Sequence, residues 1–294
     1  MKKAGKRLFA GKRKGSYMAY LFLLPWLFGF ALFVAWPTVK TLYYSLCEVK
    51  VTASQLVISF TGIDNYADVW MNNIYFIRRV LNFLLSCVLQ TPVIVIFSLL
   101  IALMLNSIHK GKALFRTIFF LPVIIVSGPV INELVGQGAT SVPMLEEQWL
   151  LQTITGVLPP WAAEPVSLLF SQLIIILWYS GIQILLFLAM LQRIDLNMIE
   201  AARIDGASGW EIFWKITLPA IRPIILLNTI YTIVNLANSD RNGVISLVSS
   251  SILDPMQGYG VAAAMAWIHT VIVLLLLGVA LLLLRNRPEK PKKN

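Results

Sequence analysis

Six long apolar runs constrain this chain more than any other feature of its sequence. They cover residues 17–39, 80–105, 113–135, 166–191, 220–239 and 261–284. A helix needs about 20 apolar residues to cross the hydrocarbon core of a bilayer. Because no water reaches that core, every backbone polar group there must be satisfied within the protein, which here requires helices. The sequence therefore predicts an all-α polytopic membrane protein with six transmembrane helices.

Charged residues are scarce and unevenly distributed. Only 13% of the 294 residues are charged, against about 25% in soluble proteins. Nineteen of the 24 Lys and Arg residues fall in the two terminal tails, in the loops after the second and fourth runs, or at the starts of the third and fifth runs, where Arg116 and Arg222 lie. Basic loops stay in the cytoplasm, so both termini are predicted to be cytoplasmic. Residues 1–16 and 285–294 are then basic tails on either side of a six-span domain over residues 17–284. The net charge of +10 is explained by orientation and contact with anionic lipid, not by binding to nucleic acid.

A charged, helix-prone segment follows the fourth run. Asp195 or Asn197 can cap a first short helix, and Ser208 with Glu211 fits the S-x-x-E capping box of a second. Gly206 lies between them, where the chain breaks the helix or lets another backbone come close. We predict a hairpin of two short helices on the cytoplasmic side. The alternative is an amphipathic hairpin that rests on lipid headgroups.

The same segment carries a long motif of the form E-A-A, three residues, G, nine residues, I-x-L-P. Its members are Glu200, Ala201, Ala202, Gly206, Ile216, Leu218 and Pro219. This pattern resembles the signature of the membrane-spanning subunit of binding-protein-dependent ABC importers. The stretches FTGIDNY (60–66) and LFRTIFFLP (114–122) are similar to the carbohydrate-uptake branch, in particular to the first permease subunit of maltose- and oligosaccharide-type systems.

The resemblance implies a type I ABC importer permease in the bacterial plasma membrane. The hairpin over 195–219 would dock into a cleft of a separate ATPase subunit, where Glu200 would meet a basic residue and Gly206 would form the bend; Asp205 belongs to the same coupling surface. The implied partners are a second permease subunit in a heterodimer, two ATP-binding subunits, an extracellular solute-binding protein and a sugar. ATP and Mg would be bound by those partners, and this chain would hold no cofactor.

No sequence motif for catalysis is found in the chain. A P-loop needs G-x-x-x-x-G-K-[ST], and the nearest approach, Gly5 to Gly11-Lys12, has one residue too many and Arg13 in place of Ser or Thr. There is no H-E-x-x-H, and the two cysteines and two histidines suggest neither a disulfide framework nor a metal site. The chain is therefore expected to be a non-catalytic subunit, with ATP hydrolysis in a partner.

A polar stripe runs along the fifth apolar run. Amides and phenols can hydrogen-bond sugar hydroxyls, and one helical face can present them together. The predicted substrate path consists of Asn228, Tyr231, Thr232, Asn235 and Asn238, with Tyr179 and Gln183 from the fourth run. The alternative is that such side chains hydrogen-bond between helices, which is the interpretation we adopt for Asn82 and Gln90. His269 is expected to be a packing residue.

No Asp or Glu lies in the middle of any apolar run. Many ion-coupled carriers place a carboxylate there, so its absence favours ATP-driven import, and the uncharged stripe favours a neutral solute. We predict a membrane-spanning subunit that forms half of the translocation pathway for a sugar or oligosaccharide delivered by an external binding protein. The alternatives are an importer of the same type for a polyol, sugar phosphate or amino acid, and an ion-coupled secondary carrier.

Overall fold

The computed structural model describes residues 14–51, 56–107, 156, 159, 173–239, 241–252 and 258–285. The chain divides into two compact units. One comprises Met1–Phe76 with Leu247–Ile268, and the other comprises Ile77–Ser246 with His269–Asn294. Each unit is described by itself below.

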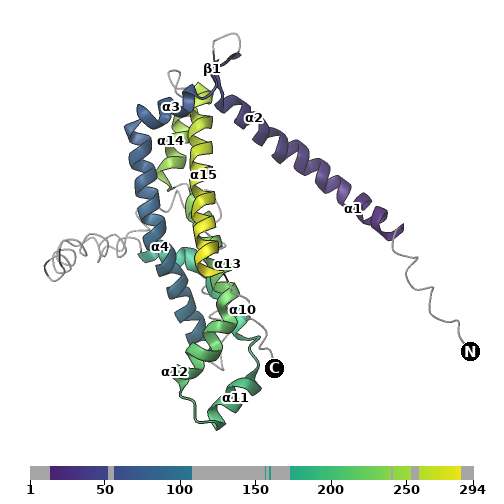
Figure 1. The fold of residues 1–294 in the computed structure, drawn as a ribbon, viewed down its shortest axis with the longest axis vertical. Coiled ribbons are helices and arrows are strands. Elements are labelled where there is room, and N and C mark those ends of the chain that lie inside the picture. The colour runs from purple at the N-terminus through teal and green to yellow at the C-terminus, as the bar shows by residue number, and fades with distance from the viewer. Residues whose placement is uncertain are drawn as a thin grey trace, which may run out of the picture. The chain divides into compact units, whose positions relative to one another are not determined.

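Most of the described chain is helical, as the apolar runs predict (Figure 1). The helices of the first unit are α1 (Lys14–Phe30), the π-helical segment η1 (Ala31–Ala35), α2 (Trp36–Ser45) and α3 (Asp64–Met71). The second unit holds α10 (Leu173–Leu191), α11 (Leu196–Ile204), α12 (Gly209–Ile212), the π-helical segment η2 (Phe213–Thr217) and α13 (Leu218–Ala237). The division between the units falls within α4 (Ile74–Ser107), α14 (Gly243–Ile252) and α15 (Gly258–Leu284).

Within the described residues, four helices are long and apolar enough to cross a membrane. They are Leu21–Ser45, Ile74–Ser107, Gly209–Ala237 and Gly258–Leu284. Ser180–Leu191 and Leu196–Ile204 are bent by 66° at a short break and would be a fifth if counted as one span. The run predicted over 113–135 lies outside the described residues, so the number of six stays a prediction.

The expectation of an all-α chain is wrong at one place in the first unit. Strands β1 (Cys47–Val51) and β2 (Leu56–Phe60) pair antiparallel, with Cys47 opposite Phe60 and Val51 opposite Leu56. The segment CEVKV alternates apolar and charged residues, a pattern that suits a strand with two different faces. The alternation is only five residues long and follows an apolar run, so the stronger helical signal obscured it.

A close backbone approach fixes β1 against the start of α15 in the same unit. The Asn65 amide Nδ2 donates to the carbonyl oxygens of Ser45 and Cys47, both at 2.9 Å. A Cβ atom on Gly260 would lie 2.1 Å from the Cys47 oxygen, closer than any non-bonded contact allows. Glycine at this position is therefore required by the packing of α15 on the strand.

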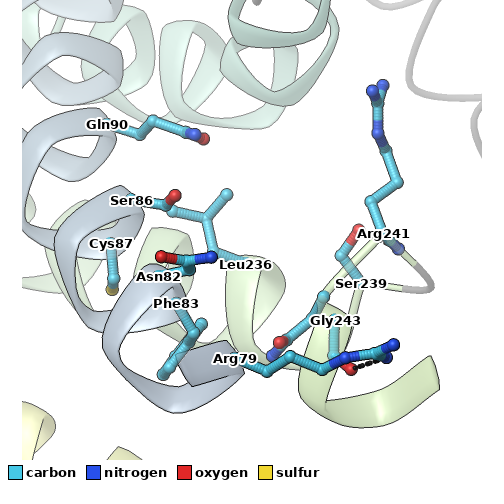
Figure 2. A pocket seen from close by; sticks show the side chains of 11 residues that line it. Arg79, Asn82, Phe83, Ser86, Cys87, Gln90, Leu236, Ser239, Arg241 and Gly243 are labelled. Carbon is cyan, nitrogen blue, oxygen red and sulfur yellow. Dashed lines mark hydrogen bonds between the residues drawn. The ribbon is translucent and has the colours of Figure 1, made fainter. Parts of the chain in front are cut away.

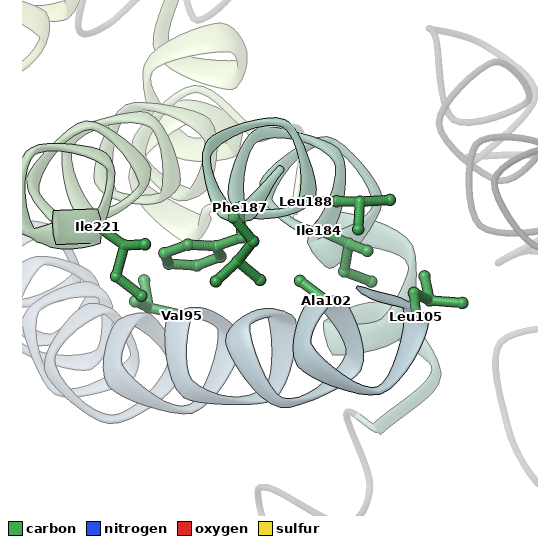
Figure 3. Packing of buried hydrophobic residues seen from close by; sticks show 8 residues of the cluster. Val95, Ala102, Leu105, Ile184, Phe187, Leu188 and Ile221 are labelled. Atoms are coloured by element: carbon green, nitrogen blue, oxygen red, sulfur yellow. The ribbon is translucent and has the colours of Figure 1, made fainter. Parts of the chain in front are cut away.

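The core of the second unit lies where α4, α10 and α13 meet (Figure 3). Ala102 of α4, Ile184 and Phe187 of α10, and Ile221 of α13 are completely buried. The other members of this cluster, which we call the three-helix core, are Val95, Leu105, Leu188 and Leu191. Aromatic and branched side chains fill the space between the helices, and this packing holds the polar residues of α10 and α13 in register.

Candidate functional site

The segment between α10 and α13 forms the predicted pair of short helices. Asp195 Oδ1 accepts a hydrogen bond from Asn197 N at 3.0 Å and caps α11. Ser208 Oγ accepts from Glu211 N at 3.3 Å, and Glu211 Oε2 accepts from Ser208 N at 3.0 Å. The predicted capping box is therefore present at the start of α12. We call Asp195–Pro219 the hairpin.

Gly206 ends α11 in the left-handed backbone region, with φ at +86°. Gly206 N donates to Arg203 O at 3.1 Å, and Ala207 N donates to Ala202 O at 2.9 Å. These are the two hydrogen bonds of a Schellman motif, which satisfies the last carbonyls of a helix. No heavy atom lies within 4 Å of the position a Cβ would take. Glycine is favoured here by the backbone angle and not by crowding.

The outer surface of the hairpin mixes carboxylates with large apolar side chains. Glu200, Ala201 and Asp205 are exposed, and Ala202 is half-buried. Ile204 is 86% exposed and Trp210 is 71% exposed. Among the described residues we find no ion pair to Glu200. Exposed apolar residues gathered beside unpaired charge are typical of a surface that another protein covers.

The second half of the hairpin forms an ion pair within its own first turns and packs against the three-helix core. Lys215 Nζ lies 3.1 Å from Glu211 Oε1. Leu218 packs against the three-helix core, Ile216 is half-buried, and Pro219 is exposed in the first turn of α13.

The polar stripe on α13 has two edges, and the first edge is buried against α10. Gln183 Nε2 donates to Thr232 Oγ1 at 3.0 Å, and Asn228 Nδ2 donates to Gln183 O at 3.3 Å. Thr232 Oγ1 donates to Asn228 O at 2.8 Å. None of the three side chains is more than 1% exposed. In the structure these three residues hydrogen-bond between helices, which is the alternative to a role in the solute path.

The second edge of the stripe is not covered by α10 in this way. Tyr231 and Asn235 are half-buried, and Asn238 is exposed. A helix turns by about 100° per residue, so these three side chains fall within roughly 60° of one another. Tyr179 belongs to α10, but its side chain lies outside the described residues. Of the predicted path, Tyr231, Asn235 and Asn238 are the described residues that remain available to a solute.

A polar cavity of about 330 Å³ lies between α4 and the turn from α13 to α14 (Figure 2). Its polar lining consists of Arg79, Asn82, Ser86 and Gln90 from α4, with Ser239, Arg241 and Asn242 from the turn. Arg79 Nη1 donates to Gly243 O at 2.7 Å and holds the start of α14 against α4. We call this space the arginine cavity.

Sequence reasoning did not find the arginine cavity. It assigned Asn82 and Gln90 to packing between helices, whereas the structure places both in the cavity lining. A signal was present, because Asn82, Ser86 and Gln90 recur every four residues and therefore share one helical face. The contribution of Arg241 depends on how the turn after α13 folds back, and spacing along the chain does not reveal that.

His269 lies beside the cavity in a packing role. Its side chain is buried, its Nε2 lies 3.2 Å from the Ala237 oxygen, and its ring meets the edge of Phe83 with centroids 4.9 Å apart.

Comparison with known proteins gives consistent matches over most of the chain. A family model described as "Binding-protein-dependent transport system inner membrane component" matches residues 69–287. The chain is 28% identical over 280 residues to the probable ABC transporter permease protein YesP of Bacillus subtilis. The alignment covers 89% of this chain and 88% of YesP. It is 31% identical over 222 residues to the lactose transport system permease protein LacF of Rhizobium radiobacter, covering 74% of this chain and 72% of LacF.

A solved structure shares the fold. It is a chain of a bacterial alginate ABC transporter, crystallised in complex with an alginate pentasaccharide-bound periplasmic protein. The TM-score is 0.58 at 19% identity, and the superposition covers 92% of this chain and 95% of that chain. At this level of identity the likeness concerns the fold alone.

Proposed function

Because this chain belongs to the family of binding-protein-dependent transport system inner membrane components, we propose that it forms half of the translocation pathway of an ATP-driven importer for a sugar or oligosaccharide. It is a multi-pass protein of the plasma membrane and a non-catalytic permease subunit, and the ATPase is a separate subunit. The words "binding-protein-dependent" in the family description support delivery of the solute by an external binding protein.

The proposed solute class is supported by the relatives and by the chemistry of α13. LacF is named for lactose, and we transfer only the class, saccharide, to this chain. Tyr231, Asn235 and Asn238 can donate to and accept from sugar hydroxyls, and a tyrosine ring can stack on the apolar face of a pyranose.

The proposed assembly contains a second permease subunit, making a heterodimer, and two ATP-binding subunits that hold ATP and Mg. We place six spans in this chain, with both termini in the cytoplasm. The exposed edge of α13 supports a second permease, because an amide such as Asn238 is costly next to lipid. A partner helix on that edge would enclose a polar path between the two subunits.

The hairpin is proposed as the element that receives the motion of the ATPase. This proposal is supported by the finding that the hairpin is ordered by hydrogen bonds between its own residues. Both of its helices are fixed by bonds within five residues, at Asp195, Gly206 and Ser208, while Glu200 and Trp210 on its outer surface remain exposed. A segment that is shaped before docking loses little conformational entropy when it docks.

The test is transport by the complete complex reconstituted in proteoliposomes, comparing wild type with Glu200→Gln and Gly206→Val. Leaving a charge unpaired at a docked interface costs about 2–5 kcal/mol, so uptake and binding-protein-stimulated ATP hydrolysis should both fall at least about tenfold. Asp68→Asn is the matched control, because it removes an exposed carboxylate of α3 and should leave both rates unchanged. Normal uptake with normal ATPase stimulation in both hairpin variants contradicts the coupling role.

A separate measurement tests the transport class. Vesicles that contain the complex but no ATP should not accumulate solute under an imposed sodium or proton gradient. Accumulation under those conditions would replace the proposal with the ion-coupled carrier.

A further inference from the structure

The arginine cavity combines two cations with neutral polar groups. Arg79 and Arg241 line it, together with Asn82, Ser86 and Gln90. Figure 2 shows Gln90 and Arg241 on opposite sides of the open space. Among the described residues that line the cavity, none is acidic. Asp240, beside Arg241 in the sequence, lies outside the described residues. A volume of about 330 Å³ is at the lower end of the range of small-molecule sites, which starts at about 300 Å³.

Both guanidinium groups have donors to spare. Arg79 uses Nη1 for the bond to the Gly243 carbonyl, and a guanidinium has five N–H donors in all. In the part of the chain that the structure describes, we find no carboxylate within ion-pair distance of Arg79 or Arg241. A bound anion would therefore meet N–H groups that no carboxylate of the described residues already occupies.

The start of α14 adds to the positive potential at the same place. Gly243, the first residue of α14, lines the cavity, and the first turn of this helix contains no acidic residue. Helix N-termini carry a partial positive charge and favour anions. The field of this helix therefore acts in the same direction as the two arginines.

We propose that the arginine cavity binds the carboxylate of an acidic saccharide, so that the imported solute is a uronate-containing sugar. The proposal rests on the proposed function, because it assigns the solute of the same pathway. Arginine presents two parallel N–H groups that match the two oxygens of a carboxylate. The amides of Asn82 and Gln90 and the Ser86 hydroxyl supply the neutral donors and acceptors that sugar hydroxyls need. This refines the expectation of a neutral solute, which considered only the uncharged stripe of α13.

The experiment measures saccharide binding to the complete purified complex in nanodiscs, trapped with ATP and vanadate, by equilibrium dialysis. The acidic probes are disaccharides of glucuronate, galacturonate and mannuronate, and the neutral probes are the same disaccharides with their carboxyl groups reduced. A phosphorylated glucose disaccharide tests whether another anion is preferred. In wild type, at least one uronate disaccharide should bind at least tenfold more tightly than its reduced counterpart. Arg79→Gln and Arg241→Gln should each weaken uronate binding at least tenfold more than neutral binding, which abolishes that preference.

Matched variants separate a charge effect from a folding effect. Arg78→Gln alters an exposed arginine of α4 that does not line the cavity, and it should keep the preference. Arg241 has an exposed side chain, so Arg241→Gln tests the site even if Arg79→Gln loosens the contact with α14. Arg79→Lys keeps the charge but not the paired donors and should give an intermediate preference.

The outcomes distinguish this inference from the proposed function. Equal affinity for acidic and neutral sugars, or a preference that survives both arginine variants, overturns the inference and leaves saccharide import standing. Tighter binding of the phosphate that is lost in the same variants overturns the carboxylate assignment. If a complex with normal ATPase stimulation binds none of these saccharides, the proposed function fails.

Discussion

The hairpin and the α10–α13 contact are both built around polar residues, yet they are stabilised in different ways. In the hairpin, the bonds of Asp195, Gly206 and Ser208 join residues no more than five positions apart, and the outer surface is exposed. In the α10–α13 contact, Gln183 and Thr232 are 49 positions apart and completely enclosed. The hairpin therefore keeps its shape through local bonds, whereas the contact exists only when the helices pack.

Because of this difference, a substitution in the hairpin and one in the α10–α13 contact should have different effects on stability and on transport. Removing an exposed side chain of the hairpin should hardly change stability, although a partner would lose its contact. Removing a buried side chain beneath the α10–α13 contact should destabilise the whole unit, because a cavity is left behind.

The largest expected effect on stability is that of Phe187→Ala. Phe187 is completely buried in the three-helix core, and truncation of a buried Phe costs about 3–5 kcal/mol. Trp210→Ala removes a larger ring that is 71% exposed and should change stability by less than about 0.5 kcal/mol. Denaturant unfolding of the two purified variants in detergent compares them directly. Equal destabilisation would show that the hairpin is part of the core and would remove the distinction.

A smaller effect is expected for Gly206→Ala. The left-handed backbone region costs a residue with a Cβ about 1–2 kcal/mol, and nothing nearby adds a steric clash. Hydrogen exchange at Ala207 should speed up accordingly, since its N–H bond closes the Schellman motif. Gly209→Ala is the matched control, because that glycine lies in α12 with equally open surroundings. Slower exchange at Ala207 in Gly206→Ala would contradict the assigned role of the φ angle.

The smallest effect is expected for Thr232→Val. The change keeps the shape but removes the acceptor of the Gln183 amide, and such bonds between membrane helices average about 0.6 kcal/mol, with a maximum of about 1.7 kcal/mol. Thr229→Val is the control, because among the described residues its hydroxyl bonds to Ile225 O of its own helix and to no residue of α10. A double-mutant cycle with Gln183→Leu measures the coupling. A coupling energy of zero would mean that the hydrogen bond between Gln183 and Thr232 does not stabilise the contact.

The local features of the molecule could be predicted from the sequence. The capping box of Ser208 and Glu211 joins residues three positions apart, so its pattern is visible in the sequence. The resemblance of the Glu200-to-Pro219 motif to ABC importer permeases is confirmed by membership of the family.

Features that depend on distant partners could not be predicted in the same way. The stripe on α13 indicated one polar face, but periodicity does not tell which edge meets α10, and so Asn228 and Thr232 were grouped with Asn235. The arginine cavity needs Arg241 to return toward α4, and that return depends on the turn after α13. The roles of Glu200 in coupling and of Asn238 in the path stay predictions.

The joints at the two ends of the hairpin are unequal. Before it, Ser180–Leu191 and Leu196–Ile204 meet at a bend of 66° across a break, whereas Gly209–Ala237 continues through η2 as one helix. At about 1.5 Å per residue, that helix is roughly 40 Å long. A displacement of Trp210 would therefore tilt or slide the helix Gly209–Ala237 as a whole and move Asn235 with it. The bend before α11 would change its angle in response to the same displacement and leave α10 in place. If the hairpin receives the motion of the ATPase as proposed, this geometry predicts that α13 moves while α10 stays in place.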